Sequence, residues 1–299
     1  IFYMVINIGS LFGRGASYIV RTLLANLSLI FAVAAACSML ALAVVVFVYR
    51  DPETELGQGA AKKPRKTALQ VLVGMVMVLR NVRFALFLLV SSGFFFLYAQ
   101  VYNVLPMYLK RVVETNPAVD LYTMANPFVI VFFQLLITKH FGKMRPIRSM
   151  IVGIVIIAFA MIVNLIPIFA ADNVRAAFLG WLPIGSVMII LTVAMIAFGE
   201  LFTSARTYEY IGALAPKGEE GLFLGYANLP MAIGALVGGP AGAAIFNEIM
   251  AKDAKVLDNG LLELDPVNNA LGWIVLMGIG LASAVSMVLY NRWIERHPA

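Results

Sequence analysis

Glu200 is the residue of this sequence that is best placed to do chemistry. It lies in the apolar stretch 181–202 and, apart from Glu248 at the very end of the run 222–249, is the only acidic residue inside eight long apolar runs. An ionisable group at membrane depth is costly, so it is a candidate functional residue by default. If the helix continues past Thr203 towards Tyr208 and Tyr210, Glu200 lies well inside the membrane. If the helix ends at Phe202, the carboxylate could instead extend to the cytoplasmic surface.

A second group of polar residues lies on one face of the first apolar run. At about 100° per residue, the members fall within roughly a quarter of the helix circumference. They are Tyr3, Asn7, Ser10, Arg14, Tyr18 and Arg21. Such a face is expected to line a water-filled cavity or to meet the opposing half of a bundle. Hydrogen bonding between helices would explain Ser10 and Tyr18 equally well, but the charge of Arg14 needs a partner or water.

Glycines at four-residue spacing mark two places where helices could approach closely. Gly9 and Gly13 lie on another side of the first run, away from the polar face. A repeated ridge of small residues lies in the run 222–249, formed by Gly234, Gly238 and Gly242. Another helix can approach closely at Gly9 and Gly13, and close helix packing is the main expectation for the ridge. A hinge that takes part in gating is the alternative for the ridge.

The sequence offers little support for enzymatic chemistry. His140 and His297 lie at the edges of apolar runs, and no HExxH, CxxC or P-loop motif is present. The glycine-rich stretch 234–242 lies inside an apolar run and lacks a following Lys-Ser pair, which argues against phosphate binding. We therefore predict no enzyme, no metal site and no cofactor.

The elements that must position these residues are membrane-spanning helices. The chain is 62% hydrophobic and 13% charged, a composition that soluble domains of this length do not show. The fold class is therefore all-α integral membrane, since a lipid-exposed backbone must satisfy its own hydrogen bonds. The expected spans are residues 1–20, 24–49, 84–108, 121–138, 150–169, 181–202 or beyond, 222–249 and 271–290.

Basic residues indicate the orientation of these spans. The net charge of +6 comes from residues in short loops, which is not the continuous basic face of a nucleic-acid-binding protein. Loops on one side carry most of the arginine and lysine, including Arg50, Lys62, Lys143, Arg206 and Arg296. By the positive-inside rule this side is cytoplasmic. We expect a multi-pass protein of the plasma (inner) membrane with a cytoplasmic C-terminus.

The layout also predicts a domain organisation. Residues 1–49 would be the last two helices of an N-terminal half, and residues 50–83 a cytoplasmic linker. Within the linker, the apolar stretch 69–79 is too short to cross a membrane and is expected to be an interfacial helix. Residues 84–299 would be a six-helix C-terminal half. This arrangement is typical of a twelve-helix transporter with four helices missing at the front.

Local motifs resemble those of one transporter family. Residues 2–11 resemble the signature F-Y-x-x-I-N-x-G-S-L of the proton-dependent oligopeptide transporters, a family of the major facilitator superfamily. In that family the signature lies on the fifth transmembrane helix. Asn126-Pro127 resembles the Asn-Pro of the eighth helix, and Gly199-Glu200 the Gly-Glu of the tenth. The loop 141–145 resembles a degenerate form of the superfamily's basic loop. The resemblance covers the whole chain as helices five to twelve.

The resemblance implies roles for several residues. It places Tyr3, Asn7, Asn126 and Glu200 on the central cavity, with Glu200 facing the amino end of a peptide. The energy source would be the proton gradient. On physical grounds Pro127 removes a backbone donor, so the helix is expected to bend next to Asn126. A kink without a binding role is an equally good interpretation.

The seventh helix of that scheme has two polar faces. Tyr98 shares one face with Ser91 and Tyr102, while Gln100 lies on the other, near Asn103. One of these faces would line the cavity and bind substrate through Tyr98 or Gln100. The other would join helices, and the sequence leaves both assignments open.

The sequence also departs from the family pattern. Ala99 stands where peptide transporters commonly have an acidic residue, so one expected charge pair is absent. Ser204-Ala205 replaces the family's Ser-Pro, and Arg14 replaces a residue that is usually uncharged. These departures weaken a peptide as the substrate more than they weaken transport itself.

The expected function is proton-coupled symport of dipeptides, tripeptides or related small solutes by alternating access. Its partners would be a small-molecule substrate, protons and the lipid bilayer, with no nucleic acid. One alternative is transport of a different solute, such as a drug or an organic anion held by Arg14. The other is a non-transporting membrane scaffold or receptor-like protein.

Overall fold

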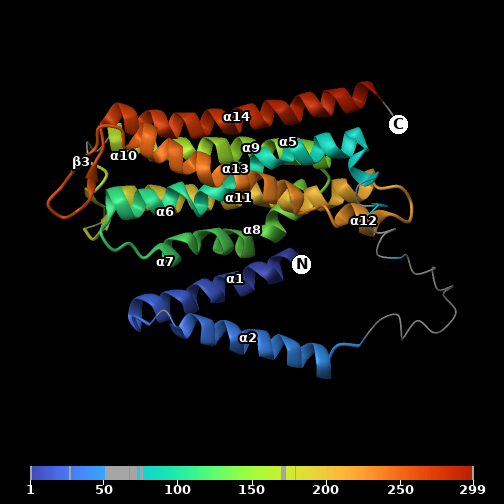
Figure 1. The fold of residues 1–299 in the computed structure, drawn as a ribbon, viewed down its shortest axis with the longest axis horizontal. Helices are drawn as coiled ribbons and strands as arrows, with labels where there is room; N and C mark the ends of the chain where they lie inside the picture. Colours follow the sequence, from blue (N-terminus) through green and yellow to red (C-terminus); the bar gives the residue numbers. More distant parts are fainter. Residues whose placement is uncertain are drawn as a thin grey trace.

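The computed structural model describes residues 2–26, 28–50, 67, 73–74, 77–169, 173–178 and 180–297. Within these ranges the chain is almost entirely helical, as Figure 1 shows. Seven helical segments of the described residues are long and apolar enough to cross a membrane. They are Ser28–Phe47, Val82–Val113, Val119–Phe141, Pro146–Phe169, Ile184–Leu214, Glu220–Met250 and Pro266–Arg296. The linker at 51–66 lies outside the described residues, as does most of the expected interfacial helix at 69–79.

The first expected span is a helix, but it is not among the seven. It consists of α1 (Phe2–Tyr18), which continues as the π-helix η1 (Ile19–Leu23). Asn7, Ser10 and Arg14 lie within this helix and reduce its apolar character. α2 (Ser28–Phe47) follows and has no buried residue. In Figure 1, α1 and α2 lie along one side of the other helices, and α1 packs against α7 and α8.

The other six membrane-length segments pack together as one bundle. The first three consist of α5 (Val82–Tyr98), η2 (Ala99–Val101), α6 (Val104–Tyr108) and η3 (Leu109–Val113); α7 (Val119–Thr123) and α8 (Ala125–Phe141); and α9 (Pro146–Ile162), η4 (Val163–Leu165) and α10 (Ile166–Phe169). The last three are α11 (Ile184–Leu214); α12 (Glu220–Leu224), α13 (Leu229–Ala244) and η5 (Ile245–Met250); and α14 (Pro266–Arg296). Every segment is longer than its expected span, because polar residues at its ends are also helical.

The break between α7 and α8 agrees with the expected effect of Pro127. α7 ends at Thr123 and α8 begins at Ala125, so the helix is interrupted next to Asn126. Pro127 has no N–H with which to bond the carbonyl of Thr123, four residues earlier. The regular pattern resumes when Phe128 N–H donates to the carbonyl of Met124 at 3.0 Å. The helix is thus interrupted at the place where the sequence predicted a bend.

Two short hairpins lie in the described loops, where no strand was predicted. β1 (Ala177–Phe178) pairs antiparallel with β2 (Leu182–Pro183), and Phe178 lies opposite Leu182. β3 (Lys255–Val256) pairs antiparallel with β4 (Leu262–Glu263), and Lys255 lies opposite Glu263. These pairs satisfy the backbone groups of chain segments that leave the helices.

One end of the bundle is tied together by arginines. Arg83 at the start of α5 donates to the carbonyl of His297 at 2.7 Å. Arg145 at the start of α9 lies 4.0 Å from Glu295 of α14. Arg206 of α11 donates to the carbonyl of Gly142 at 2.6 Å. The basic loops thus gather at one end, as an alternating up-and-down path of the helices requires.

Glycines set the closest helix contacts. A Cβ atom at Gly234 would lie 2.7 Å from Phe95 Cβ, so the α13 ridge packs directly on α5, which confirms the close packing expected there. A Cβ at Gly199 would lie 2.6 Å from the carbonyl oxygen of Gly153, which brings α11 against α9. Gly9 and Gly13 have nothing within 4 Å of the same position, so no described helix makes the close approach that these glycines allow.

We predict that Gly153→Ala destabilises the protein. The added methyl group would overlap with Thr203 Oγ1 and the carbonyl oxygen of Gly199, and overpacking of this kind costs about 1–3 kcal/mol. Gly278→Ala on α14 is the matched control, since that position is exposed with nothing within 4 Å. Thermal unfolding of the purified protein in detergent should show a lower midpoint for Gly153→Ala alone. Equal midpoints for the two variants would contradict the close contact between α9 and α11.

Candidate functional site

Glu200 lies close to the middle of α11, a helix of 31 residues from Ile184 to Leu214. The helix continues well past Phe202, and the Glu200 residue is only 8% exposed. Of the two interpretations left open by the sequence, the one in which the carboxylate extends to the surface was therefore wrong. The carboxylate is instead buried between helices, where it needs hydrogen-bond donors.

Donors from two other helices reach this carboxylate. The hydroxyl of Tyr3, on α1, donates to Glu200 Oε1. The side-chain amide of Asn126, at the start of α8, donates to Glu200 Oε2 at 2.9 Å. Asn126 is itself buried, at 4% exposure. The break before α8 places Asn126 at the beginning of its helix, from which its amide reaches across to α11. Three helices thus meet at one carboxylate.

The polar face of α1 continues from Tyr3 towards Arg14. Asn7 is buried, and its side-chain amide donates to the carbonyl of Tyr3 at 2.9 Å on the same helix. Arg14 donates to the hydroxyl of Tyr102 at 3.0 Å, and its guanidinium carbon lies 5.8 Å from the centre of that ring. Arg14 is also close enough to the Glu200 carboxylate to interact with it electrostatically. The hydrogen-bond partner of Arg14 is therefore Tyr102, which lies between η2 and α6.

The two polar faces of the seventh helix have different surroundings. Tyr98 interacts with the Glu200 carboxylate and packs edge-on against Tyr102, with ring centres 6.1 Å apart. Gln100 is fully buried, and its amide donates to the carbonyls of Phe96 at 2.7 Å and Gly238 at 3.1 Å. The structure thus brings Tyr98 to the other candidate residues. Gln100 is separated from them, because its side chain points from η2 to α13.

Tyr102 contacts this site but was not among the site residues predicted from the sequence. It lies on the expected face with Tyr98, and that shared face was the only signal. Its side chain is 56% exposed and accepts the hydrogen bond from Arg14. The cluster therefore consists of Glu200, Asn126 and Tyr98 together with Tyr102 and the α1 residues Tyr3, Asn7 and Arg14.

A second contact joins α1 to the bundle nearer the end of the helix. Arg21 in η1 forms an ion pair with Asp120 of α7 at 3.1 Å. Nearby, Glu114 accepts hydrogen bonds from Tyr122 at 3.1 Å and from the hydroxyl of Ser186. Arg21 belongs to the polar face predicted for the first helix. Its partner is 99 residues away in the sequence, so no local pattern could identify it.

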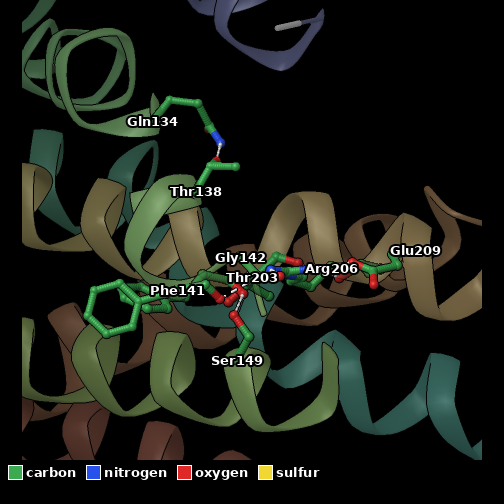
Figure 2. Close-up of polar contacts among 10 residues, drawn as sticks. Gln134, Thr138, Phe141, Gly142, Ser149, Thr203, Arg206 and Glu209 are labelled. Atoms are coloured by element: carbon green, nitrogen blue, oxygen red, sulfur yellow. Dashed lines mark hydrogen bonds and ion pairs between the residues drawn. The ribbon is translucent and has the colours of Figure 1, made fainter. Parts of the chain in front are cut away.

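The opposite end of α11 is anchored by Arg206, which Figure 2 shows reaching Gly142. Its guanidinium bonds the carbonyls of Phe141 and Gly142 at the end of α8 and pairs with Glu209 at 2.5 Å. A cation at this position satisfies the free carbonyls of a helix terminus. Ser149 of α9 also donates to the carbonyl of Phe202 at 2.7 Å. These contacts fix α8, α9 and α11 relative to one another and so fix the level of Glu200.

Comparisons with known proteins identify the fold. No protein-family model matches the sequence, and no curated protein matches it. A crystal structure of the peptide transporter POT in complex with sulfate matches with a TM-score of 0.55 and 15% identity, covering 90% of this chain and 53% of that chain. The POT family transporter PepTSo matches with a TM-score of 0.53 and 18% identity, over 80% of this chain and 45% of that one.

A POT family transporter in complex with 5-aminolevulinic acid matches similarly, with a TM-score of 0.53, 15% identity, and coverage of 89% of this chain and 54% of that one. This chain therefore spans about half the length of the solved structures that it matches. Identities this low demonstrate a common fold. The chain is an all-α, multi-pass membrane protein with the major facilitator fold of the POT family transporters.

Proposed function

We propose that this chain is part of a proton-coupled transporter of the oligopeptide transporter family, which moves short peptides or related small solutes by alternating access. The observation that carries the proposal is the Glu200 carboxylate, held near the middle of α11 by donors from α1 and α8. The common fold and the signature-like segment at residues 2–11 support it. In such transporters, substrate and coupling-ion sites lie near the membrane midplane between two halves.

The contacts of Glu200 suit a proton-coupling role. Tyr3 lies on α1, which we assign to the N-terminal half, whereas Asn126 and Tyr98 lie in the C-terminal half of residues 84–299. When two halves move apart, the carboxylate exchanges the Tyr3 hydroxyl and the Arg14 charge for water or for a substrate amine. A carboxyl group that changes its donors and nearby charges also changes its proton affinity. Proton binding would thereby depend on which side of the membrane the cavity faces.

We predict that Glu200→Gln abolishes proton-driven accumulation but leaves substrate exchange. Glutamine keeps nearly the same shape and an oxygen that can accept from Tyr3 or Asn126, but it cannot titrate at physiological pH. The measurement is peptide uptake into proteoliposomes of the complete protein, with and without an imposed proton gradient. Glu248→Gln is the control, because it removes an exposed carboxylate from η5, away from the contacts of Glu200. Undiminished uphill uptake by Glu200→Gln would exclude the coupling role.

Arg14 favours a second candidate, transport of an organic anion. The guanidinium presents a fork of donors that fits a carboxylate, and here it lies on the polar face of α1 beside an exposed Tyr102. The same residue could hold the carboxylate end of a peptide. Both candidates therefore use Arg14 to bind a carboxylate, and they differ in whether the substrate also needs an amine.

We predict that Arg14→Ala weakens binding of solutes with a carboxylate by at least about tenfold, the usual scale for hydrogen bonds to charged groups. Neutral amides of the same solutes should lose much less. The measurement is equilibrium binding of matched acid and amide pairs to the purified complete protein. An unchanged ratio of acid to amide affinity would mean that Arg14 only joins α1 to Tyr102. If N-acetylated peptides compete for binding as strongly as peptides with a free amino group, the organic-anion candidate is favoured.

We also predict the sidedness of the bundle. The end that carries Arg83, Arg145 and Arg206 is assigned to the cytoplasm, because its loops are the basic ones. In a Cys37→Ser background, Lys217→Cys should react with an impermeant thiol reagent only from the cytoplasmic side. Asp258→Cys, in the exposed turn between β3 and β4, should react only from outside. Reversed labelling at both positions would mean that the protein has the opposite orientation in the membrane. Labelling of both positions from one side would contradict the helix count.

A further inference from the structure

We propose that a cavity at the end of the bundle opposite the basic loops binds a small zwitterionic solute, one that carries both an ammonium and a carboxylate group. The cavity has a volume of about 630 Å³ and lies among the ends of η3 and α10, the β3–β4 hairpin and the start of α14. It is separate from Glu200, which does not line it. Its volume is in the range of small-molecule sites, about 300–1,000 Å³.

Carboxylates line one part of this cavity. Asp265 is the N-cap of α14 and accepts from the backbone N–H groups of Val267 and Asn268 at 3.1 and 2.9 Å. Asp253 and Glu263 also line the cavity, and among the described residues neither side chain makes a hydrogen bond or an ion pair. Two exposed carboxylates without such partners provide acceptors for an ammonium group.

Arg175 provides the opposite charge. One of its guanidinium nitrogens donates to the carbonyls of Val112 at 3.2 Å and Leu262 at 3.3 Å, which holds the side chain between η3 and the hairpin. In the described part of the chain, its side-chain hydrogen bonds use this nitrogen alone. The rest of the planar group remains available for a carboxylate, which a guanidinium can bind with two parallel hydrogen bonds.

Asn269 forms a buried polar part of the cavity wall. It lines the cavity and is only 4% exposed. Its amide nitrogen donates to the hydroxyl of Tyr108 at 2.9 Å, whereas its Oδ1 has no hydrogen-bond partner among the described residues. A buried acceptor without a partner is costly, so native structures rarely leave one unsatisfied. This oxygen is closed off from the cavity, so Asn269 forms part of the cavity wall and is not assigned a contact with the solute.

Together these groups match a solute with charges of both signs. A simple anion would be repelled by the carboxylates, and a simple cation would be repelled by Arg175 and Lys255. A free amino acid or a dipeptide presents its ammonium group and its carboxylate at once. The inference does not depend on the transport proposal, because it concerns binding at a site that Glu200 does not touch.

The test uses protection of a cysteine by ligand in the purified complete protein. In a Cys37→Ser background, Val174→Cys places a thiol on the cavity wall beside Arg175, whereas Val256→Cys places one on β3, where the side chain is 73% exposed and does not line the cavity. The probes are dialanine, N-acetyl-dialanine, dialanine amide and phosphoethanolamine. We expect dialanine to slow labelling at position 174 but not at 256. Both capped derivatives should protect more weakly.

Adding Glu263→Gln to Val174→Cys should raise the dialanine concentration that gives half protection about two- to fivefold, the scale of an exposed ion pair. Absence of protection at position 174 would overturn the proposal, and so would equal protection at both positions, which would indicate a global change in shape. Protection by phosphoethanolamine without protection by dialanine would assign the cavity to a lipid headgroup instead. Failure of peptide uptake with intact protection would contradict only the transport proposal.

Discussion

A carboxylate in the middle of an apolar helix bundle must be surrounded by hydrogen-bond donors, and the rest of the site depends on this requirement. Glu200 obtains its donors from Tyr3 and Asn126, which lie on helices far apart in the sequence. Because the two oxygens of the carboxylate are bound by different helices, any movement of α1 relative to α8 changes the surroundings of the charge. The same interaction that stabilises the buried group therefore also makes it sensitive to conformation.

Close packing beside the carboxylate keeps it in place. Gly199 precedes Glu200 and faces Gly153, so α11 and α9 approach at backbone distance directly beside the carboxylate's position on the helix. Ser149 and Arg206 add hydrogen bonds between the same helices towards the basic end. A helix that is fixed on one side by glycine contacts and by backbone hydrogen bonds can present an ionisable side chain at a constant depth.

The two ends of the bundle use charge differently. At the basic end, arginines bind backbone carbonyls where helices terminate, as Arg206 does with Gly142. At the opposite end, charged groups of both signs lie around the hairpins, and Arg175 joins η3 to β4. The first arrangement uses positive charge to satisfy helix termini. The second leaves carboxylates and part of a guanidinium available for other partners.

The sequence by itself determined that the protein is an all-helical membrane protein, since the length of its apolar runs and the need to satisfy the backbone in lipid allow little else. It also identified Glu200 and the polar face of α1, because charged and polar residues inside an apolar run can be recognised from the sequence alone. The sequence left open whether α11 ends at Phe202 or continues, because residues 203–214 mix polar and apolar side chains. Only the tertiary structure decided that the helix continues to Leu214. Similarly, the 3₁₀ turn after Tyr98 changes the angle between successive residues, so helical periodicity could not place Gln100 against α13. The pairs Arg21–Asp120 and Tyr3–Glu200 join residues that are distant in the chain, and such contacts depend on how helices pack rather than on any local pattern.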